Sequence, residues 1–106
     1  MITVTVYKDS RGYKGFQSKG HAGYAEEGYD IICAAVSALT VNAVNSVEQF
    51  TEDGFTVQSE DGRLFFQLDE EASERTALLL DSMLLGLQEI QNTYGNEYIR
   101  LIFKEV

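Results

Sequence analysis

The sequence predicts an α+β fold, a two-layer α/β sandwich in which two helices lie on one face of a mainly antiparallel sheet. Two segments carry apolar residues three and four positions apart, the period of an amphipathic helix. Five shorter segments alternate apolar with polar residues, the period of a strand. Their order along the chain is β-β-α-β-β-α-β. Because two helices are too few to cover both faces of such a sheet, we expect both on one face and the other face open.

The first two predicted strands form a hairpin. Residues alternate along Ile2–Tyr7 as in a strand with one buried face. Asp9–Gly12 has the composition of a turn with glycine at its last position, and Tyr13–Lys19 then returns antiparallel. This hairpin delivers His21, the only histidine of the chain, to one end of the sheet.

The first predicted helix runs from about Ile31 to Phe50. Asp30 is a good N-cap residue, because its carboxylate can accept a hydrogen bond from a backbone N–H two or three residues on. With this cap, Cys33 lies in the first turn, beside unpaired N–H groups and the positive end of the helix dipole. The residues expected on the buried stripe of this helix step by three and four. They are Ile32, Val36, Leu39, Ala43, Val47 and Phe50.

A second hairpin follows this helix. Two alternating segments flank Asp61-Gly62, a strong signal for a two-residue turn. The resulting register pairs Val57 with Phe66 and Phe55 with Leu68, so that the apolar residues share one face. Phe65 falls on the opposite face, where it is either simply exposed or part of a contact surface.

The second helix is expected to begin with the acidic run Asp69–Glu71, because negative charge is favourable at a helix start. Leu78 and Leu85 lie beside its buried stripe, and either widen the core face, which we favour, or form a dimer contact. Tyr94–Asn96 closes the helix, with its glycine as the terminating residue. Residues 99–104 alternate as the last strand. The buried stripe consists of Thr76, Leu79, Leu80, Met83, Leu87 and Ile90.

Composition limits the classes of function. The 106 residues predict a single domain, residues 1–106. Seventeen acidic residues against eight basic ones, a net charge of −9, argue against a nucleic-acid surface and fit a basic protein partner. We find no signal peptide and no apolar run near the roughly 20 residues that span a bilayer. A single cysteine cannot form an internal disulfide, so an oxidising compartment would bring this chain no benefit. We therefore expect a cytoplasmic protein. We also expect no metal and no cofactor.

His21 and Cys33 suggest thiol chemistry. A cysteine at a helix N-terminus favours the nucleophilic thiolate, and a protonated histidine would offset the repulsion from nearby carboxylates. The same N–H groups would stabilise the oxyanion of an acyl-transfer intermediate. The plain alternatives are a buried structural cysteine and a surface histidine, in a non-catalytic module that binds through the open sheet face.

Two strings in this region resemble the signature of the ribosomal-processing cysteine protease family, called Prp, and the resemblance extends over essentially the whole chain. In that family the catalytic pair falls on His21 and Cys33, and the family's Asp and Ser around the cysteine fall on Asp30 and Ser37. Asp30 either orients His21 or only caps the helix. Ser37 either reaches the site or bonds back to a helix carbonyl. The strings are Gly20-His21-Ala22-Gly23-Tyr24 and Gly28-Tyr29-Asp30-Ile31-Ile32-Cys33-Ala34-Ala35-Val36-Ser37.

The resemblance implies a cytoplasmic bacterial endopeptidase that forms a homodimer. Its substrate would be a basic large-subunit ribosomal protein whose short N-terminal extension is removed by a cut after two phenylalanines. The alternative is a non-catalytic binding module, a ribosome-assembly or adaptor protein. The intervening segment has few apolar anchors to offset the entropy of ordering, so we expect a mobile substrate-binding loop that closes over the peptide. Its residues are Gly20, Gly23, Tyr24, Glu26, Glu27, Gly28 and Tyr29.

Overall fold

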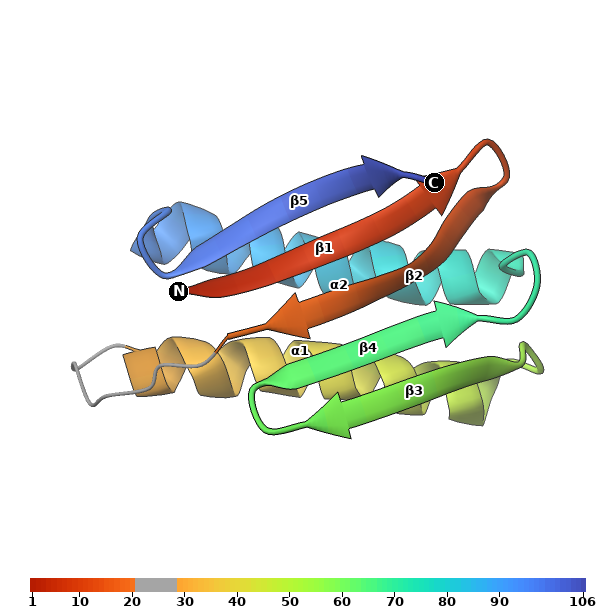
Figure 1. The fold of residues 1–106 in the computed structure, drawn as a ribbon, viewed down its shortest axis with the longest axis horizontal. Helices are drawn as coiled ribbons and strands as arrows, with labels where there is room; N and C mark the ends of the chain where they lie inside the picture. The colour runs from red at the N-terminus through yellow and green to blue at the C-terminus, as the bar shows by residue number, and fades with distance from the viewer. Residues whose placement is uncertain (21–28) are drawn as a thin grey trace.

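The computed structural model describes residues 1–20 and 29–106, apart from the side chains of Tyr29 and Asp30. Its elements follow the order β-β-α-β-β-α-β, and both helices lie on one face of the sheet (Figure 1). The predicted two-layer α+β sandwich is therefore confirmed. The elements are β1 (Ile2–Asp9), β2 (Gly12–Lys19), α1 (Tyr29–Phe50), β3 (Phe55–Glu60), β4 (Arg63–Leu68), α2 (Glu74–Tyr94) and β5 (Ile99–Glu105).

The sheet has the strand order β3-β4-β2-β1-β5. All neighbours are antiparallel except β1 and β5, which are parallel. The end of β2, the turn between β3 and β4, and the start of α1 consequently lie at the same end of the molecule (Figure 1). This convergence builds the site described below.

The second hairpin has the predicted register, with Val57 opposite Phe66 and Phe55 opposite Leu68. Gly62 in its turn has φ 72°, a conformation that glycine adopts without a Cβ penalty. Val57 is nevertheless 44% exposed, because β3 is an edge strand. Phe65 lies on the face away from the helices, as predicted, where its ring meets that of Tyr7.

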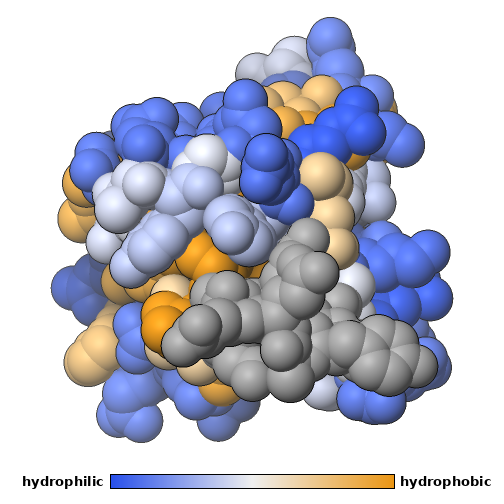
Figure 2. All heavy atoms as spheres, turned by 90° about the vertical axis from the view of Figure 1, so that its left-hand side faces the viewer, coloured by the Kyte–Doolittle hydropathy of each residue, from blue (hydrophilic) through white to orange (hydrophobic). Residues whose placement is uncertain are grey.

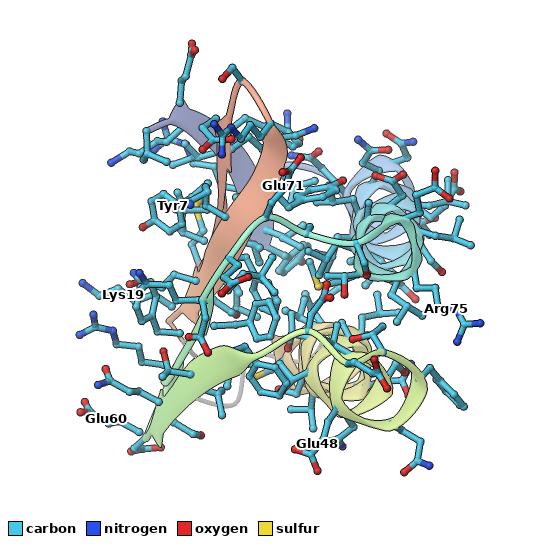
Figure 3. The ribbon with its side chains drawn as sticks, turned by 90° about the vertical axis from the view of Figure 1, so that its right-hand side faces the viewer. Tyr7, Lys19, Glu48, Glu60, Glu71 and Arg75 are labelled. Carbon is cyan, nitrogen blue, oxygen red and sulfur yellow. The ribbon has the colours of Figure 1, made fainter. Side chains whose placement is uncertain are left out.

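The core fills the space between the sheet and the two helices. Phe16 and Phe66 stack at its centre with ring centroids 5.3 Å apart, and Phe55 adds a third ring 5.0 Å from Phe66. Complete burial of a phenylalanine, as for Phe16 and Phe66, contributes about 1.5–3 kcal/mol. The helices supply Ile32, Val36 and Val47 from α1, and Leu80, Met83 and Leu87 from α2. Tyr7, Lys19 and Glu60 project on the opposite side of the sheet (Figure 3).

The buried stripe of α1 matches the prediction except at its end. Ile32, Val36, Ala43 and Val47 are buried and Leu39 is half-buried, but Phe50 is 59% exposed. The prediction for Phe50 was wrong, because periodicity shows which side of a helix is apolar and not how far the surface beneath it extends. The window Ile31–Phe50 is also long and apolar enough to cross a membrane, with mean hydropathy 1.5, against our expectation. Here it packs on the sheet as a core helix.

The start and the outer surface of α2 differ from the prediction. Ser73 caps the helix, because its hydroxyl accepts a hydrogen bond from the backbone N–H of Thr76 at 3.2 Å, and the acidic run Asp69–Glu71 precedes the helix. Leu78 and Leu85 are 68% and 61% exposed, so they do not widen the core face as we favoured. Gly95 ends the helix as predicted, with φ 92° and its N–H bonded to the carbonyl of Gln91.

Candidate active site

Cys33 lies one turn into α1, half-buried, and packs against the core. The helix begins at Tyr29, so Asp30 is its second residue. The prediction that Asp30 is the N-cap was therefore wrong. The unpaired N–H groups of the helix therefore belong to residues up to Ile31, and that of Cys33 is within the helical ladder. Because Cα–Cβ bonds tilt toward the helix N-terminus, the thiol still faces the turn that carries those groups.

A groove of about 240 Å³ runs beside Cys33. Three segments form its walls: the first half of α1, the end of β2, and the turn between β3 and β4. Figure 2 shows this end of the molecule, where some apolar surface lies among polar side chains. The lining residues are Ser18, Gly20, Cys33, Ser37, Thr40, Val41, Ser59, Glu60, Asp61, Gly62, Arg63 and Leu64.

Gly20 fixes the point at which the chain leaves β2. Its N–H donates to the carbonyl of Gly62 at 2.8 Å, which ties it to the hairpin turn. Its φ is 107°, a region that L side chains rarely adopt, and a Cβ here would lie 2.4 Å from the carbonyl oxygen of Met1. Only glycine fits this position, and the next residue in the chain is His21.

The hairpin side of the groove carries exposed charge. Asp61 is exposed in the turn that borders the groove. Glu60 and Arg63 contribute to this wall, but their side chains lie on the open face of the sheet, where Arg63 donates to the side-chain oxygen of Gln17 at 3.3 Å. Hydroxyls of Ser18, Ser37 and Ser59 complete a polar lining suited to an extended peptide. Among residues 1–20 and 31–106, no group of three His, Cys, Asp or Glu side chains is placed to hold a metal ion.

The structure brings together the site residues that it describes. Cys33, Ser37 and Gly20 line one groove. Two hydroxyls bond back to carbonyls of α1: that of Thr40 donates to Val36 at 2.9 Å, and that of Thr51 donates to Val47 at 2.8 Å. Ser37 is exposed to the groove. The predictions for His21, Gly23, Tyr24, Glu26, Glu27 and Gly28, and for the side chains of Asp30 and Tyr29, lie outside the described residues.

Sequence reasoning missed the contribution of the hairpin turn, residues 59–64. The Asp61-Gly62 signal located the turn correctly, but its place beside Cys33 depends on the pairing of β4 with β2. No local pattern specifies which strands of a sheet become neighbours. The groove therefore followed only from the three-dimensional structure.

Comparison with known proteins finds matches that cover most of the chain. A family model described as cysteine protease Prp matches residues 1–100. The ribosomal processing cysteine protease Prp of Bacillus subtilis is 33% identical over 101 residues, covering 89% of this chain and 90% of the relative. Its counterpart in Staphylococcus aureus is 33% identical over 107 residues, covering 98% and 100%.

Solved structures agree as well. The S. aureus Prp in complex with a substrate peptide has a TM-score of 0.90 at 32% identity, and covers 98% of this chain and 100% of that one. The same enzyme with a covalently linked product peptide has a TM-score of 0.87 at 33% identity, with the same coverage. The fold and a thiol lining an open groove define a cysteine peptidase of the α+β class. The chain belongs to the cysteine protease Prp family, which favours the protease over the non-catalytic module.

Proposed function

We propose that this enzyme removes the short N-terminal extension of a large-subunit ribosomal protein, with Cys33 as nucleophile and His21 as its base. The supporting observation is the groove, in which the only thiol of the chain lies together with Gly20, the residue before His21. The relatives' name, ribosomal processing cysteine protease, supports the substrate class.

The chemistry is acyl transfer. The Cys33 thiolate, held as an ion pair by protonated His21, attacks the scissile carbonyl carbon and forms a tetrahedral oxyanion. His21 then protonates the leaving amine, the C–N bond breaks, and the N-terminal fragment stays on sulfur as a thioester. A water molecule, deprotonated by His21, hydrolyses the thioester and restores the thiol. Peptide N–H groups of the first turn of α1 stabilise the oxyanion.

Asp30 and Ser37 have supporting roles. Since Asp30 is not the N-cap, capping no longer explains it, and we assign its carboxylate to orienting His21. Ser37 is exposed one helical turn beyond Cys33 and lines the same groove. Its hydroxyl is free to bond a peptide backbone there.

The substrate is a basic peptide cut after a pair of phenylalanines. Asp61 lies in the turn that borders the groove, so its carboxylate is available to basic residues in addition to those of Glu26 and Glu27. Val41, which also lines the groove, is 47% exposed and offers an apolar surface to a phenylalanine. In this proposal residues 20–29 close over the peptide, with Tyr24 and Tyr29 against the phenylalanine rings.

The enzyme acts as one domain, residues 1–106, in the cytoplasm, where ribosomal proteins are made. We propose that it is a homodimer, and that the exposed Leu78 and Leu85 on one side of α2 form part of the contact. Exposed leucines seven positions apart recur on the same face of a helix, as an interface requires.

Intact mass measurement of an uncut ribosomal-protein precursor tests this proposal. Incubation with the wild-type enzyme should give two products whose masses place the cut after the phenylalanine pair. The Cys33→Ala variant should give none, while its circular dichroism and melting temperature match the wild type. Cleavage by Cys33→Ala above a few per cent of the wild-type rate would contradict the assignment of the nucleophile.

A further inference from the structure

The open face of the sheet concentrates the basic residues of this acidic chain. The strand register places Arg100, Lys19 and Arg63 in one row across the sheet, with only Thr3 between the first two. Lys104 lies beside Tyr7 on the same face, and Lys14 lines a hollow there. Five of the eight lysines and arginines of the chain are thus on one face.

Among the residues that the structure describes, few acidic side chains accompany them. Glu60 lies opposite Arg63 on the edge strand, and Asp9 is 3.9 Å from the ammonium of Lys14. Most of the 17 acidic residues of the chain are therefore not among those described on this face. The face is positive, although the net charge of the chain is −9. The net charge, which disfavours a nucleic-acid surface, says nothing about how the charges are distributed. A local basic face, and not the net charge, is what attracts phosphates.

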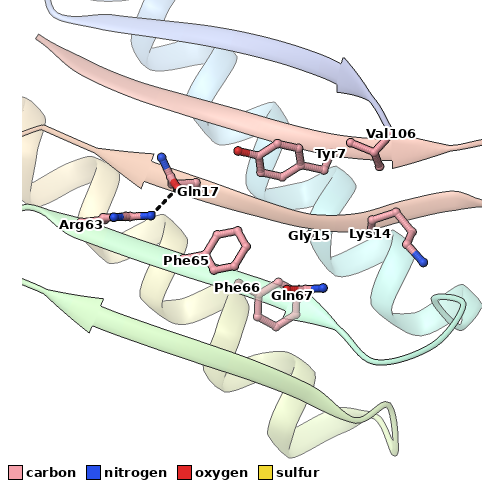
Figure 4. A pocket seen from close by; sticks show the side chains of 9 residues that line it. All are labelled: Tyr7, Lys14, Gly15, Gln17, Arg63, Phe65, Phe66, Gln67 and Val106. Atoms are coloured by element: carbon pink, nitrogen blue, oxygen red, sulfur yellow. Dashed lines mark hydrogen bonds between the residues drawn. The ribbon is translucent and has the colours of Figure 1, made fainter.

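Two aromatic rings lie among these cations. Tyr7 and Phe65 meet edge to face, with ring centroids 6.4 Å apart. They border a hollow of about 450 Å³, together with Lys14, Arg63 and the amides of Gln17 and Gln67 (Figure 4). The floor is bare backbone at Gly15, where a Cβ would lie 2.2 Å from the carbonyl oxygen of Phe66. Gln17 holds the guanidinium of Arg63 at the rim.

We propose that this face binds single-stranded RNA, through phosphate contacts along the basic row and one base in the hollow. Open sheets that bind single-stranded RNA stack unpaired bases on aromatic rings and guanidinium planes, and bond base edges with polar side chains. An acidic peptide would satisfy the cations but would not use the rings. A duplex keeps its bases stacked and leaves the hollow empty.

Fluorescence anisotropy with a fluorescein-labelled 12-nucleotide single-stranded RNA of mixed sequence tests the proposal. We expect a Kd of about 1–100 μM at physiological salt, in the range of non-specific binding. With about three phosphates neutralised, log K should fall against log salt with a slope of about −2. Arg100→Glu should weaken binding at least about threefold and make the slope shallower by about 0.7. Arg75→Glu, the same charge change on the exposed surface of α2 (Figure 3), should leave Kd within about twofold.

A second pair of variants tests the hollow. Phe65→Ala should weaken RNA binding at least about fivefold, the lower end for loss of one stacked base. Phe50→Ala, which removes an exposed phenylalanine from the end of α1, should have no effect. All variants should be folded at the assay temperature by circular dichroism, and should cleave the ribosomal precursor at the wild-type rate, so the outcome is separate from that of the proposed protease activity.

Several results would overturn the inference. A polyglutamate peptide that binds as tightly as the RNA would assign the face to an acidic protein. Equal binding of the duplex, or equal weakening by the control variants, would refute the stacking or the location. A dimer that dissociates on Arg100→Glu substitution, seen by sedimentation, would show that a second copy of this chain covers the face instead.

Discussion

Substitution of Gly20 by alanine probes the link between the fold and the active site. Gly20 has φ 107°, and its N–H is bonded to the carbonyl of Gly62 across the groove. The best control is Gly12→Ala, because Gly12 has a similar φ of 115° but nothing within 4 Å of the position of the new Cβ. The pair separates backbone strain from steric conflict.

The expected magnitudes follow from this geometry. A non-glycine residue in such a backbone conformation costs about 1–3 kcal/mol, which is the whole effect expected for Gly12→Ala. At Gly20 the added methyl would lie 2.4 Å from the carbonyl oxygen of Met1. Real contacts are longer, so the backbone must shift, at a further cost of about 1–3 kcal/mol. Such a shift displaces the N–H of Gly20 from Gly62 and moves the attachment point of His21.

Urea unfolding and peptide cleavage together measure both effects. Gly20→Ala should be less stable than Gly12→Ala by at least about 1 kcal/mol. At a temperature where both variants are fully folded, kcat/KM should fall at least about tenfold for Gly20→Ala and stay near the wild-type value for Gly12→Ala. Equal stability of the two variants together with unchanged kcat/KM for Gly20→Ala would refute the reasoning.

Three further substitutions test individual contacts. Burial alone would raise the pKa of Asp53, but hydrogen bonds from Thr76 and Ser73 outweigh it and lower the pKa below its usual 3.8. Asp53→Asn should therefore lower the free energy of unfolding by about 1 kcal/mol at pH 7. This difference, measured by urea unfolding, should vanish as the pH falls through the lowered pKa. Ser73→Ala should cost about 1 kcal/mol as a lost cap, whereas Asp69→Ala should be nearly neutral; the reverse order would restore the acidic run as the helix start. Asp30→Asn and Asp30→Ala should be equally stable within about 0.5 kcal/mol, since no cap is lost, and both should lower kcat/KM; full activity in Asp30→Asn would remove the carboxylate from the mechanism.

The fold could be predicted from the sequence where local patterns act directly. Alternation and the Asp61-Gly62 turn determine the register of the second hairpin, because a slip by one residue would expose Phe66. The helices were equally clear from their period. Their starts were not, because several residue types can cap a helix, and Ser73 was overlooked in favour of the charges before it.

Exposure and the site itself were harder to predict. Leu78 and Leu85 look like core residues by type, but the surface that α2 packs against does not extend beneath them. Cys33 was identified from its place at a helix start, yet the other wall of its groove comes from residues 59–64. Their position depends on long-range strand pairing, which no short stretch of sequence encodes.

The central claim is that Cys33 forms a thioester with the N-terminal fragment of its substrate. The most direct test is to quench the reaction with acid during turnover of the uncut ribosomal precursor and to measure the intact mass of the enzyme. The account predicts a transient species heavier by the mass of the extension peptide less one water, with the added mass on Cys33, the only cysteine. It also predicts no such species in Cys33→Ala. Cleavage that proceeds in Cys33→Ala, or an adduct on another residue, would contradict it.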